Sequence, residues 1–214
     1  MVQAFVEAGD QVMATYRASP LPASDRATAV HLDLLDAASR AAFAARVAAL
    51  PQTIDVIVLL PGIIAGLSLA DYPEGKIDEV ISTNFTSQAL LLKVLLPMLS
   101  DGAHVLLMGS VSGERGSFDP IYAASKGAII AFGKSLAVSL APRVRVNVLA
   151  PSLIEGSSMW QSMPEERRER HRRASPTGRL VDKNDLAKII VDVTQPHWSA
   201  VNGAVIRING GSNV

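Results

Sequence analysis

Short apolar runs alternate along the chain with longer segments in which apolar residues recur every three or four positions. Residues 54–60 are apolar at almost every position, which is typical of a strand that is covered on both faces. Shorter runs bounded by turn residues predict further strands, at residues 11–16, 29–32, 104–108, 145–149 and 204–208.

Helical periodicity marks the segments between these strands. It predicts helices at residues 1–8, 37–50, 76–99, 120–140 and 185–194, with a polar region at 152–181. Strands that are separated by helices pair in parallel through right-handed crossovers. The predicted fold is therefore α/β, a doubly wound, Rossmann-like parallel sheet in a single domain over residues 1–214. Ligands bind at the carboxyl ends of the strands in such sheets.

Composition removes several classes of function. The chain has 20 Lys and Arg, 20 Asp and Glu, 4 His and no Cys. Zero net charge gives no basis for nucleic acid or an anionic membrane as a partner. The lack of cysteine excludes disulfides and thiolate chemistry, and no HExxH-type spacing points to a metal. The apolar stretches are too short or too interrupted to span a bilayer, and no signal peptide is evident, so the cytoplasm is the expected compartment.

Tyr122 and Lys126 are four positions apart in a predicted helix and so share one of its faces. An ammonium group beside a phenol favours the phenolate and lowers the Tyr pKa, which makes the hydroxyl a proton donor and acceptor closer to neutral pH. The Lys side chain keeps further N–H donors for cofactor hydroxyls. Taken alone, the spacing is more often that of an exposed Tyr and Lys on a helix surface.

Two more polar residues stand where the predicted elements favour a site. Ser110 follows an apolar strand, so its hydroxyl lies at the carboxyl end and can bond a substrate carbonyl oxygen. The alternative is an ordinary Ser in a glycine-rich loop. Asn84 lies inside an otherwise apolar helical segment, and a buried Asn needs partners. Neighbouring backbone is an equally good source of those partners.

Three segments together resemble the short-chain dehydrogenase/reductase superfamily. They are Met108-Gly-Ser-Val-Ser-Gly113, Tyr122-Ala-Ala-Ser-Lys126-Gly-Ala128 and Val144-Arg-Val-Asn-Val-Leu-Ala-Pro151. Their order and spacing are similar to those of the single-domain branch that includes 3-oxoacyl-carrier-protein reductases, and the likeness extends from residue 1 to residues 208–211. The loop from Ser to Tyr is one residue shorter than is common in that branch.

The resemblance implies a role for each polar residue. Tyr122 is the general acid in reduction and the base in oxidation, and Lys126 lowers its pKa and holds the nicotinamide ribose. Ser110 polarises the substrate carbonyl, and Asn84 positions a water in the proton relay. The implied substrate is a small carbonyl compound or a secondary alcohol.

Cofactor contacts follow from the same resemblance. Asp33, with the adjacent Leu34, matches the residue that usually contacts the adenine ring. Gly62 matches the close backbone approach after the fourth family strand. Pro151 and Ile154 match the segment that contacts the nicotinamide carboxamide.

Arg17 bears on the choice of cofactor. NAD-specific members usually carry an acid at the end of the second family strand, where it binds the ribose 2′-hydroxyl. Arg17 stands there in this sequence, and a guanidinium can bind a 2′-phosphate through two hydrogen bonds. NADP(H) is therefore favoured over NAD(H), with a ligand-free surface Arg as the alternative.

Two family features have no match. The first strand and its TGxxxGxG turn have no counterpart, and Leu59-Leu60-Pro61-Gly62 replaces the usual Asn-Asn-Ala-Gly. Loss of a central strand predicts unpaired strand edges and a gap in the core. A late start assignment or a truncated sequence is the favoured explanation, because the catalytic residues are intact. The alternative is a catalytically inactive binding or scaffold protein of this fold that cannot hold the dinucleotide.

Residues 152–179 correspond to the family's substrate lid. Within it, residues 164–173 are either a basic patch for an anionic handle, such as acyl carrier protein or coenzyme A, or a solvated helix whose Glu residues offset its Arg residues. The solvated helix is favoured. The helices at 76–99 and 120–140 carry more apolar residues than one sheet face needs, and relatives use them for subunit contacts. A homodimer or homotetramer through these helices is expected.

Overall fold

The computed structural model describes residues 1–21 and 24–212. The first half of the chain forms, in order, α1 (Val2–Glu7), β1 (Val12–Tyr16), β2 (Ala27–His31), α2 (Ala37–Ala48), β3 (Ile54–Leu59), α3 (Glu74–Ile81), α4 (Ser87–Leu95) and β4 (Leu99–Met108). The second half forms α5 (Ser112–Arg115), α6 (Pro120–Ser139), β5 (Val144–Pro151), β6 (Ile154–Glu155), α7 (Ser158–Gln161), α8 (Glu165–Arg173), β7 (Val181–Asp182), α9 (Lys183–Thr194) and β8 (Val205–Ile208).

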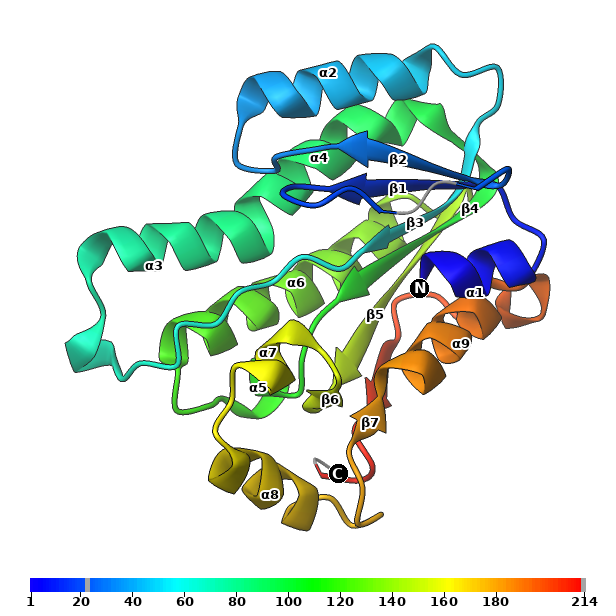
Figure 1. Cartoon of the computed structure of the whole chain (residues 1–214). Coiled ribbons are helices and arrows are strands. Elements are labelled where there is room, and N and C mark those ends of the chain that lie inside the picture. The colour runs from blue at the N-terminus through cyan, green and yellow to red at the C-terminus, as the bar shows by residue number, and fades with distance from the viewer. Residues whose placement is uncertain (22–23, 213–214) are drawn as a thin grey trace.

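The strands pair in parallel, which confirms the predicted α/β fold (Figure 1). One sheet has the order β3-β4-β5-β8, and β1 pairs with β2 in a separate sheet. Within the described residues no strand lies between β1 and β3, so the edge strand β1 of one sheet and the edge strand β3 of the other have no hydrogen-bonded neighbour on that side. This is the gap that the lack of a central first strand predicts. A short pairing of β6 with β7 anchors the lid segment beside α9.

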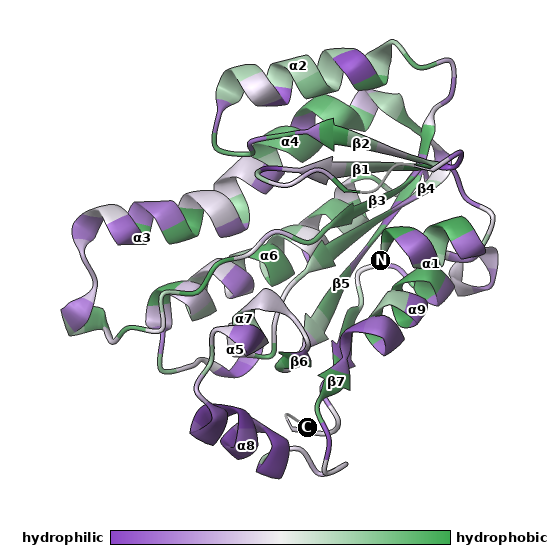
Figure 2. Ribbon diagram, viewed as in Figure 1, coloured by the Kyte–Doolittle hydropathy of each residue, from purple (hydrophilic) through white to green (hydrophobic). Residues whose placement is uncertain are grey.

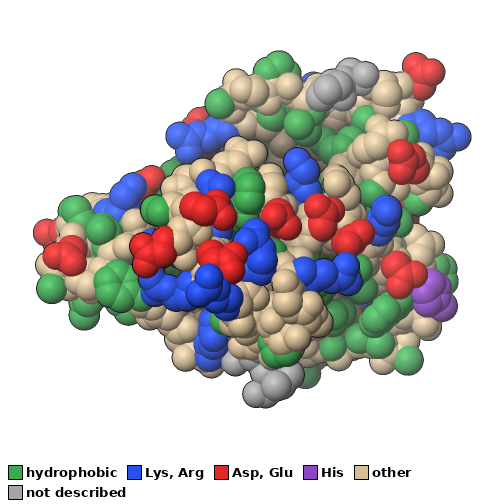
Figure 3. Space-filling model, turned by 60° about the horizontal axis from the view of Figure 1, so that its bottom comes forward, with side chains coloured by type: hydrophobic (Ala, Val, Ile, Leu, Met, Phe, Trp, Pro, Cys, Tyr) green, Lys and Arg blue, Asp and Glu red, His purple; other side chains and the backbone are tan. Residues whose placement is uncertain are grey.

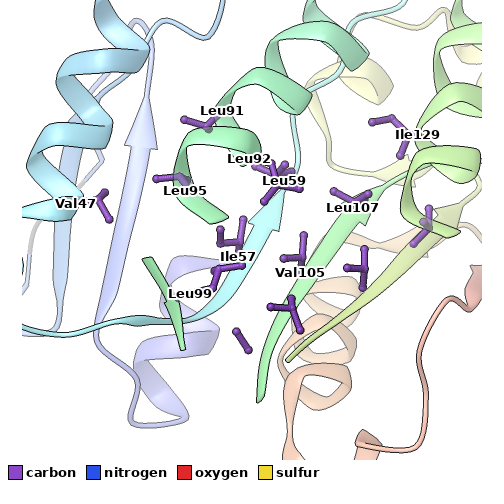
Figure 4. Packing of buried hydrophobic residues seen from close by; sticks show 14 of the residues in the cluster. Val47, Ile57, Leu59, Leu91, Leu92, Leu95, Leu99, Val105, Leu107 and Ile129 are labelled. Carbon is purple, nitrogen blue, oxygen red and sulfur yellow. The ribbon is translucent and has the colours of Figure 1, made fainter. Parts of the chain in front are cut away.

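Both faces of the four-stranded sheet are covered. On one face, Val105 and Leu107 of β4 pack in a cluster with Leu92 of α4 and with residues of α2 and α6 (Figure 4). On the other face, Leu106 and Met108 pack in a second cluster with residues of α1 and α9. Successive side chains of a strand point to opposite faces, so a strand covered on both faces must be apolar at every position. Figure 2 shows that the strands of this sheet are largely hydrophobic, whereas α8 is hydrophilic.

The helix predicted at 76–99 is correct in its middle but wrong at its C-terminal end. Leu99 belongs to β4, where it pairs with Ile54 ahead of a register shift, so this strand begins five residues before the predicted 104. Between α3 and α4 the helix widens into a π-helical turn, Ser82–Thr86, with Asn84 at its centre. The polar region at 152–181, left unassigned by periodicity, holds β6, α7, α8 and β7.

Helix α6 is a partial exception to the prediction that the apolar stretches are too short or too interrupted to span a bilayer. It has 20 residues, and an 18-residue stretch of it has a mean hydropathy of 1.2, so its length and composition are sufficient for a membrane span. The core helix of a globular domain passes the same test. Ser125, Lys126 and Ile129 of α6 are buried in the domain, and Ile129 belongs to the cluster on the sheet. This packing favours a core helix.

Candidate active site

The predicted catalytic residues converge at the carboxyl end of the four-stranded sheet. Ser110 follows β4, Asn84 lies in the π-helical turn, and Tyr122 and Lys126 lie in the first two turns of α6. All four are buried. A Cβ built on Gly62, just after β3, lies 3.0 Å from the Lys126 Nζ and 3.8 Å from the Asn84 Oδ1. Three elements far apart in sequence therefore meet around one point.

Tyr122 has its hydroxyl next to the hydroxyl of Ser110, with only 7% of the residue exposed. Burial, the largest effect, raises the pKa of Tyr122 above its usual value. The hydrogen bond with Ser110 lowers the pKa, and the charge of Asp119 raises it again. The phenol is thus kept protonated near neutral pH, which is the state that can donate a proton.

Lys126 directs its ammonium group to the main chain. Its Nζ donates to the carbonyl oxygen of Met108 at 2.7 Å, and burial lowers the pKa of Lys126 to about 8. The sequence predicted that this ammonium lowers the pKa of Tyr122. In the structure the Lys126 ammonium is bonded to the end of β4, and burial, Ser110 and Asp119 account for the shift of the Tyr122 pKa, so an effect of Lys126 on that pKa stays a prediction. An ammonium group has three N–H donors, so two remain beyond the Met108 bond.

Asn84 braces the loop that follows β3. Its side chain accepts from the Ile63 N–H at 2.8 Å and donates to the Ile63 carbonyl at 2.9 Å. Its Nδ2 also donates to the Ser125 hydroxyl at 2.9 Å, inside α6. These contacts tie the π-helical turn, the loop and the catalytic helix together. A role for Asn84 in a water relay stays a prediction.

Asp119 is a buried residue that the sequence analysis did not single out. Its Oδ1 accepts from the Tyr122 N–H at 2.9 Å and from the Tyr72 hydroxyl at 2.7 Å, and its Oδ2 accepts from the Gly66 N–H at 2.7 Å. Asp119 therefore caps α6 and joins the loop at 62–72 to it. An Asp followed by Pro120 is a common helix start, so the cap was readable from the sequence. The contact with Tyr72 was not, because 47 positions separate the two residues.

Helix α5 holds Ser110 against α6. The Ser112 N–H donates to the Ser110 Oγ at 3.1 Å, which leaves the Ser110 hydroxyl proton free to be donated elsewhere. A Cβ on Gly113 would lie 2.6 Å from the Lys126 carbonyl carbon, so only glycine allows this close packing. Arg207 donates two hydrogen bonds to the Glu114 carboxylate, from Nε at 3.0 Å and from Nη2 at 2.8 Å. The Ser-containing loop is thereby fixed from both sides.

The residues predicted for the adenosine end lie at the carboxyl ends of β1 and β2, in the separate two-stranded sheet. Arg17 Nε is 3.8 Å from Asp33 Oδ2, and the Arg17 side chain is 72% exposed. The Asp33 Oδ1 accepts from the Leu35 N–H at 2.9 Å. The carbonyl of Leu34 accepts from the Arg40 guanidinium. Arg17 and Asp33 therefore neutralise each other in part, and the Arg17 guanidinium remains largely exposed to solvent.

The residues predicted for the carboxamide segment flank the end of β5. Pro151 is buried, and its carbonyl accepts from the Val111 N–H at 3.2 Å, close to Ser110. Ile154 pairs with Val181 in the small β6–β7 sheet and packs against the second core cluster. Both lie on the segment that leads from the site into the lid.

A hollow of about 300 Å³ elsewhere on the protein lies between α1 and α9, on the opposite face of the sheet from α6. It is lined by side chains that include Glu7, Lys188 and Asp192 and by none of the predicted site residues. The chemistry is therefore assigned to the strand ends and not to this hollow.

Comparisons with known proteins agree with this arrangement. The family model described as enoyl-(acyl carrier protein) reductase matches residues 1–213. A 3-oxoacyl-[acyl-carrier-protein] reductase, FabG, of Vibrio cholerae is 32% identical over 162 residues, which are 74% of this chain and 66% of that protein. The mouse dehydrogenase/reductase SDR family member 4 is 33% identical over 153 residues, 68% of this chain and 54% of that protein. The chain thus spans about two thirds or less of these relatives.

A solved structure shows the same fold throughout. The short-chain dehydrogenase/reductase described as a glucose/ribitol dehydrogenase from Brucella melitensis superposes with a TM-score of 0.91 at 25% identity, covering 100% of this chain and 91% of that one. Together with the family match over residues 1–213, this similarity leads to one conclusion. The chain belongs to the short-chain dehydrogenase/reductase superfamily.

Proposed function

We propose that the protein transfers hydride between NADP(H) and a carbonyl or secondary-alcohol substrate, with Tyr122 as general acid in reduction and general base in oxidation. The observation that carries this proposal is the burial of Tyr122, Ser110, Lys126 and Asn84 at the carboxyl ends of the parallel strands, with the Ser110 hydroxyl near enough to Tyr122 to act on its pKa. Two hydroxyl groups so placed can hold one carbonyl oxygen. Ligands of doubly wound sheets bind at these strand ends.

Each residue has a distinct task in that reaction. Ser110 accepts from the Ser112 N–H and turns its own proton toward the substrate oxygen. Tyr122, kept protonated by burial, gives its proton to that oxygen as negative charge develops there. Lys126, whose pKa of about 8 leaves it mostly charged at neutral pH, stabilises the deprotonated phenol that results. Asn84 keeps the turn around these groups rigid.

The residues at the two ends of the site fit a nicotinamide dinucleotide. Such a cofactor supplies the hydride when it is bound. The two N–H groups of Lys126 beyond its bond to Met108 are buried donors that ribose hydroxyls would satisfy. Arg17 offers an exposed guanidinium for a 2′-phosphate, so NADP(H) is favoured over NAD(H). A glycine-rich diphosphate turn that opens a helix is not found among residues 1–21 and 24–212.

The test is spectrophotometric. NADPH oxidation should be followed against a panel of aldehydes and ketones, beside a Tyr122→Phe variant that keeps the ring and removes the hydroxyl. Loss of a general acid of this kind costs about 10²–10⁴-fold in turnover. A Phe variant as active as the parent, or no change in melting temperature with millimolar NADPH or NADH, would reject the proposal. The comparisons give no support to the inactive scaffold alternative, since the relatives in Vibrio cholerae, mouse and Brucella melitensis are described as reductases and dehydrogenases.

We propose, further, a cytoplasmic homodimer or homotetramer. Leu90 and Val94 of α4 are 42% and 40% exposed, and Val138 of α6 is 81% exposed. These apolar side chains lie on the two helices for which the sequence predicts subunit contacts. Light scattering should give a mass that is a multiple of the 22.6 kDa chain, and a Leu90→Glu, Val94→Glu variant should lower it.

A further inference from the structure

The charges of the lid helix α8 divide into two sets. Three of its arginines pair with its glutamates: Arg168 with Glu165 at 3.2 Å, and Arg172 and Arg173 with Glu169 at 2.5 and 2.9 Å. These pairs fit the interpretation of a solvated helix. The remaining basic groups of the helix take no part in these pairs.

Arg167, Arg170 and His171 form the second set. They are at positions i, i+3 and i+4 and so share one helix face. Within the described part of the chain, none of them makes an ion pair. His171 has a lowered pKa, chiefly through burial and then through the charges of Arg115, Arg167 and Arg170. Arg115 of α5, which also lacks an ion pair among these residues, therefore lies close to this face of α8.

Acidic side chains lie near some of these basic groups, and they distinguish Arg170 from the others. Arg170 borders a surface hollow together with Glu166, Glu169 and Arg173, so carboxylates lie near it. Asp119, near Arg167, already accepts from Gly66, Tyr72 and Tyr122. Arg115, Arg167 and His171 are thus the basic groups that form no ion pair among the described residues and do not border the acidic hollow, although the Asp119 carboxylate near Arg167 keeps its negative charge.

These three groups border the catalytic residues. Arg115 ends the helix that fixes Ser110 through the Ser112 N–H. An Nη1 of Arg167 lies 3.9 Å from where a Cβ on Gly66 would stand, and the Gly66 N–H is bonded to the Asp119 cap of α6. In Figure 1 the lid elements α7 and α8 lie at the same end of the molecule as α5.

We propose that Arg115, Arg167 and His171 bind an anionic group, a carboxylate or a phosphate, on the substrate whose carbonyl lies at Ser110 and Tyr122. Arginine suits such a group because its N–H donors bind two oxygens at once. The proposal names a substrate class for the proposed reductase and rests on that function. If the lid bound no anion, these unpaired basic groups would only repel one another, which is destabilising.

The anion is assigned to a small molecule and not to an acidic protein. Glu165, Glu166 and Glu169 stand on the same short helix as the basic groups. Figure 3 shows acidic and basic side chains intermingled over this end of the molecule, without a broad basic surface. An acidic protein surface would meet those glutamates and be repelled by them. A single carboxylate or phosphate can reach the basic groups without doing so.

Two measurements test this assignment. The first compares short oxo acids with their methyl esters as substrates, in the parent protein and in Arg115→Gln and Arg167→Gln variants. Arg173→Gln is the matched control, because Arg173 is bound to Glu169 on the outer side of the helix. The acids should have the higher kcat/KM, and each of the first two changes should lower that value about tenfold or more, chiefly through KM, with little effect on the esters.

The second measurement does not need turnover. Inorganic phosphate is titrated while the imidazole signals of the protein, which has 4 His, are followed by NMR. Phosphate bound beside His171 favours the imidazolium and should raise the pKa of His171 in the parent but not in an Arg115→Gln, Arg167→Gln variant.

The outcomes separate the two proposals. Turnover of esters as good as that of acids, or a His171 pKa that phosphate leaves unchanged, overturns the anion site. An acidic carrier protein that binds tightly through the same arginines, while small acids do not, overturns its assignment to a small molecule. Absence of any turnover alongside a phosphate-sensitive His171 rejects the reductase and keeps the anion site.

Discussion

The Asp119 carboxylate accepts a hydrogen bond from the backbone N–H of Tyr122 at 2.9 Å, so the residue that caps the catalytic helix also sets the electrostatic surroundings of its phenol. The same carboxylate holds Tyr72 and Gly66 of the loop beside the site. Asp119 touches no reacting atom in the proposed chemistry. It is a positioning residue.

An Asp119→Asn variant should lower the pKa of Tyr122. The amide can still cap α6, but it removes a negative charge that raises this pKa. Reduction needs the protonated phenol, so activity that is lost as pH rises through the Tyr122 pKa should be lost at a lower pH in the variant. The check is the phenolate absorbance against pH, with Tyr122→Phe to assign the signal. An unchanged titration would contradict the charge effect.

A Gly113→Ala variant should lose both stability and activity. The new methyl group would stand 2.6 Å from the Lys126 carbonyl carbon and 2.7 Å from the Gly127 nitrogen, which are backbone atoms that cannot rotate away. Overpacking of this kind costs about 1–3 kcal/mol, and here it also pushes α5 and Ser110 away from Tyr122. Chemical denaturation and kcat measure the two effects. Gly75→Ala in α3 is the control, because a Cβ there meets nothing within 4 Å.

Arg17→Ala should weaken NADPH binding and leave NADH binding nearly unchanged. Only NADPH carries the 2′-phosphate that the guanidinium would bind, and a charged hydrogen bond of this kind is worth about a tenfold change or more in affinity. Fluorescence titration with the two cofactors gives the ratio. Arg46, near the end of α2, provides a control substitution away from the site. Equal losses of affinity for NADPH and NADH would show that Arg17 does not bind the 2′-phosphate.

Acidification should destabilise the protein through His104. This residue is 1% exposed, its Nε2 lies 2.9 Å from the Asn147 Nδ2, and burial lowers its pKa from 6.5 to about 4. The unfolded chain therefore binds a proton first as pH falls, and stability is lost between pH 6.5 and about 4. The whole effect is worth about 3 kcal/mol.

The measurement is the free energy of unfolding against pH. His104→Gln should remove this part of the slope, whereas His31→Gln, at an exposed position, should keep it. An identical pH dependence in the parent and in His104→Gln would contradict the assignment.

The elements that the sequence predicted well are those in which one local pattern determines burial. The strand at 54–60 is apolar at almost every position because both of its faces are covered, and it was correct to within a residue. Leu99 was misassigned because its apolar character suits the end of a helix and the start of a strand equally. Only its pairing with Ile54, across the sheet, decides between them.

The candidate site likewise has features that the sequence predicted and features that it did not. Tyr122, Lys126, Ser110 and Asn84 were identified because order and spacing carry the family pattern along the chain. The direction of the Lys126 ammonium toward Met108 was not, because it depends on the distance between α6 and the end of β4. The sequence showed that residues 164–173 are rich in Arg, but not which of these residues lack an ion pair, nor that Arg115 approaches them from a different helix.

The strand order β3-β4-β5-β8 has a consequence for local opening of the backbone. Amides on a strand edge that bonds to no neighbour exchange with solvent deuterium faster than those inside a ladder. In β4 and β5, which have partners on both sides, exchange should require opening of the whole four-stranded sheet. The backbone that leads from these two strands into Ser110 and Pro151 should therefore be among the last to exchange, so the strand ends that carry the site stay closed during local openings elsewhere.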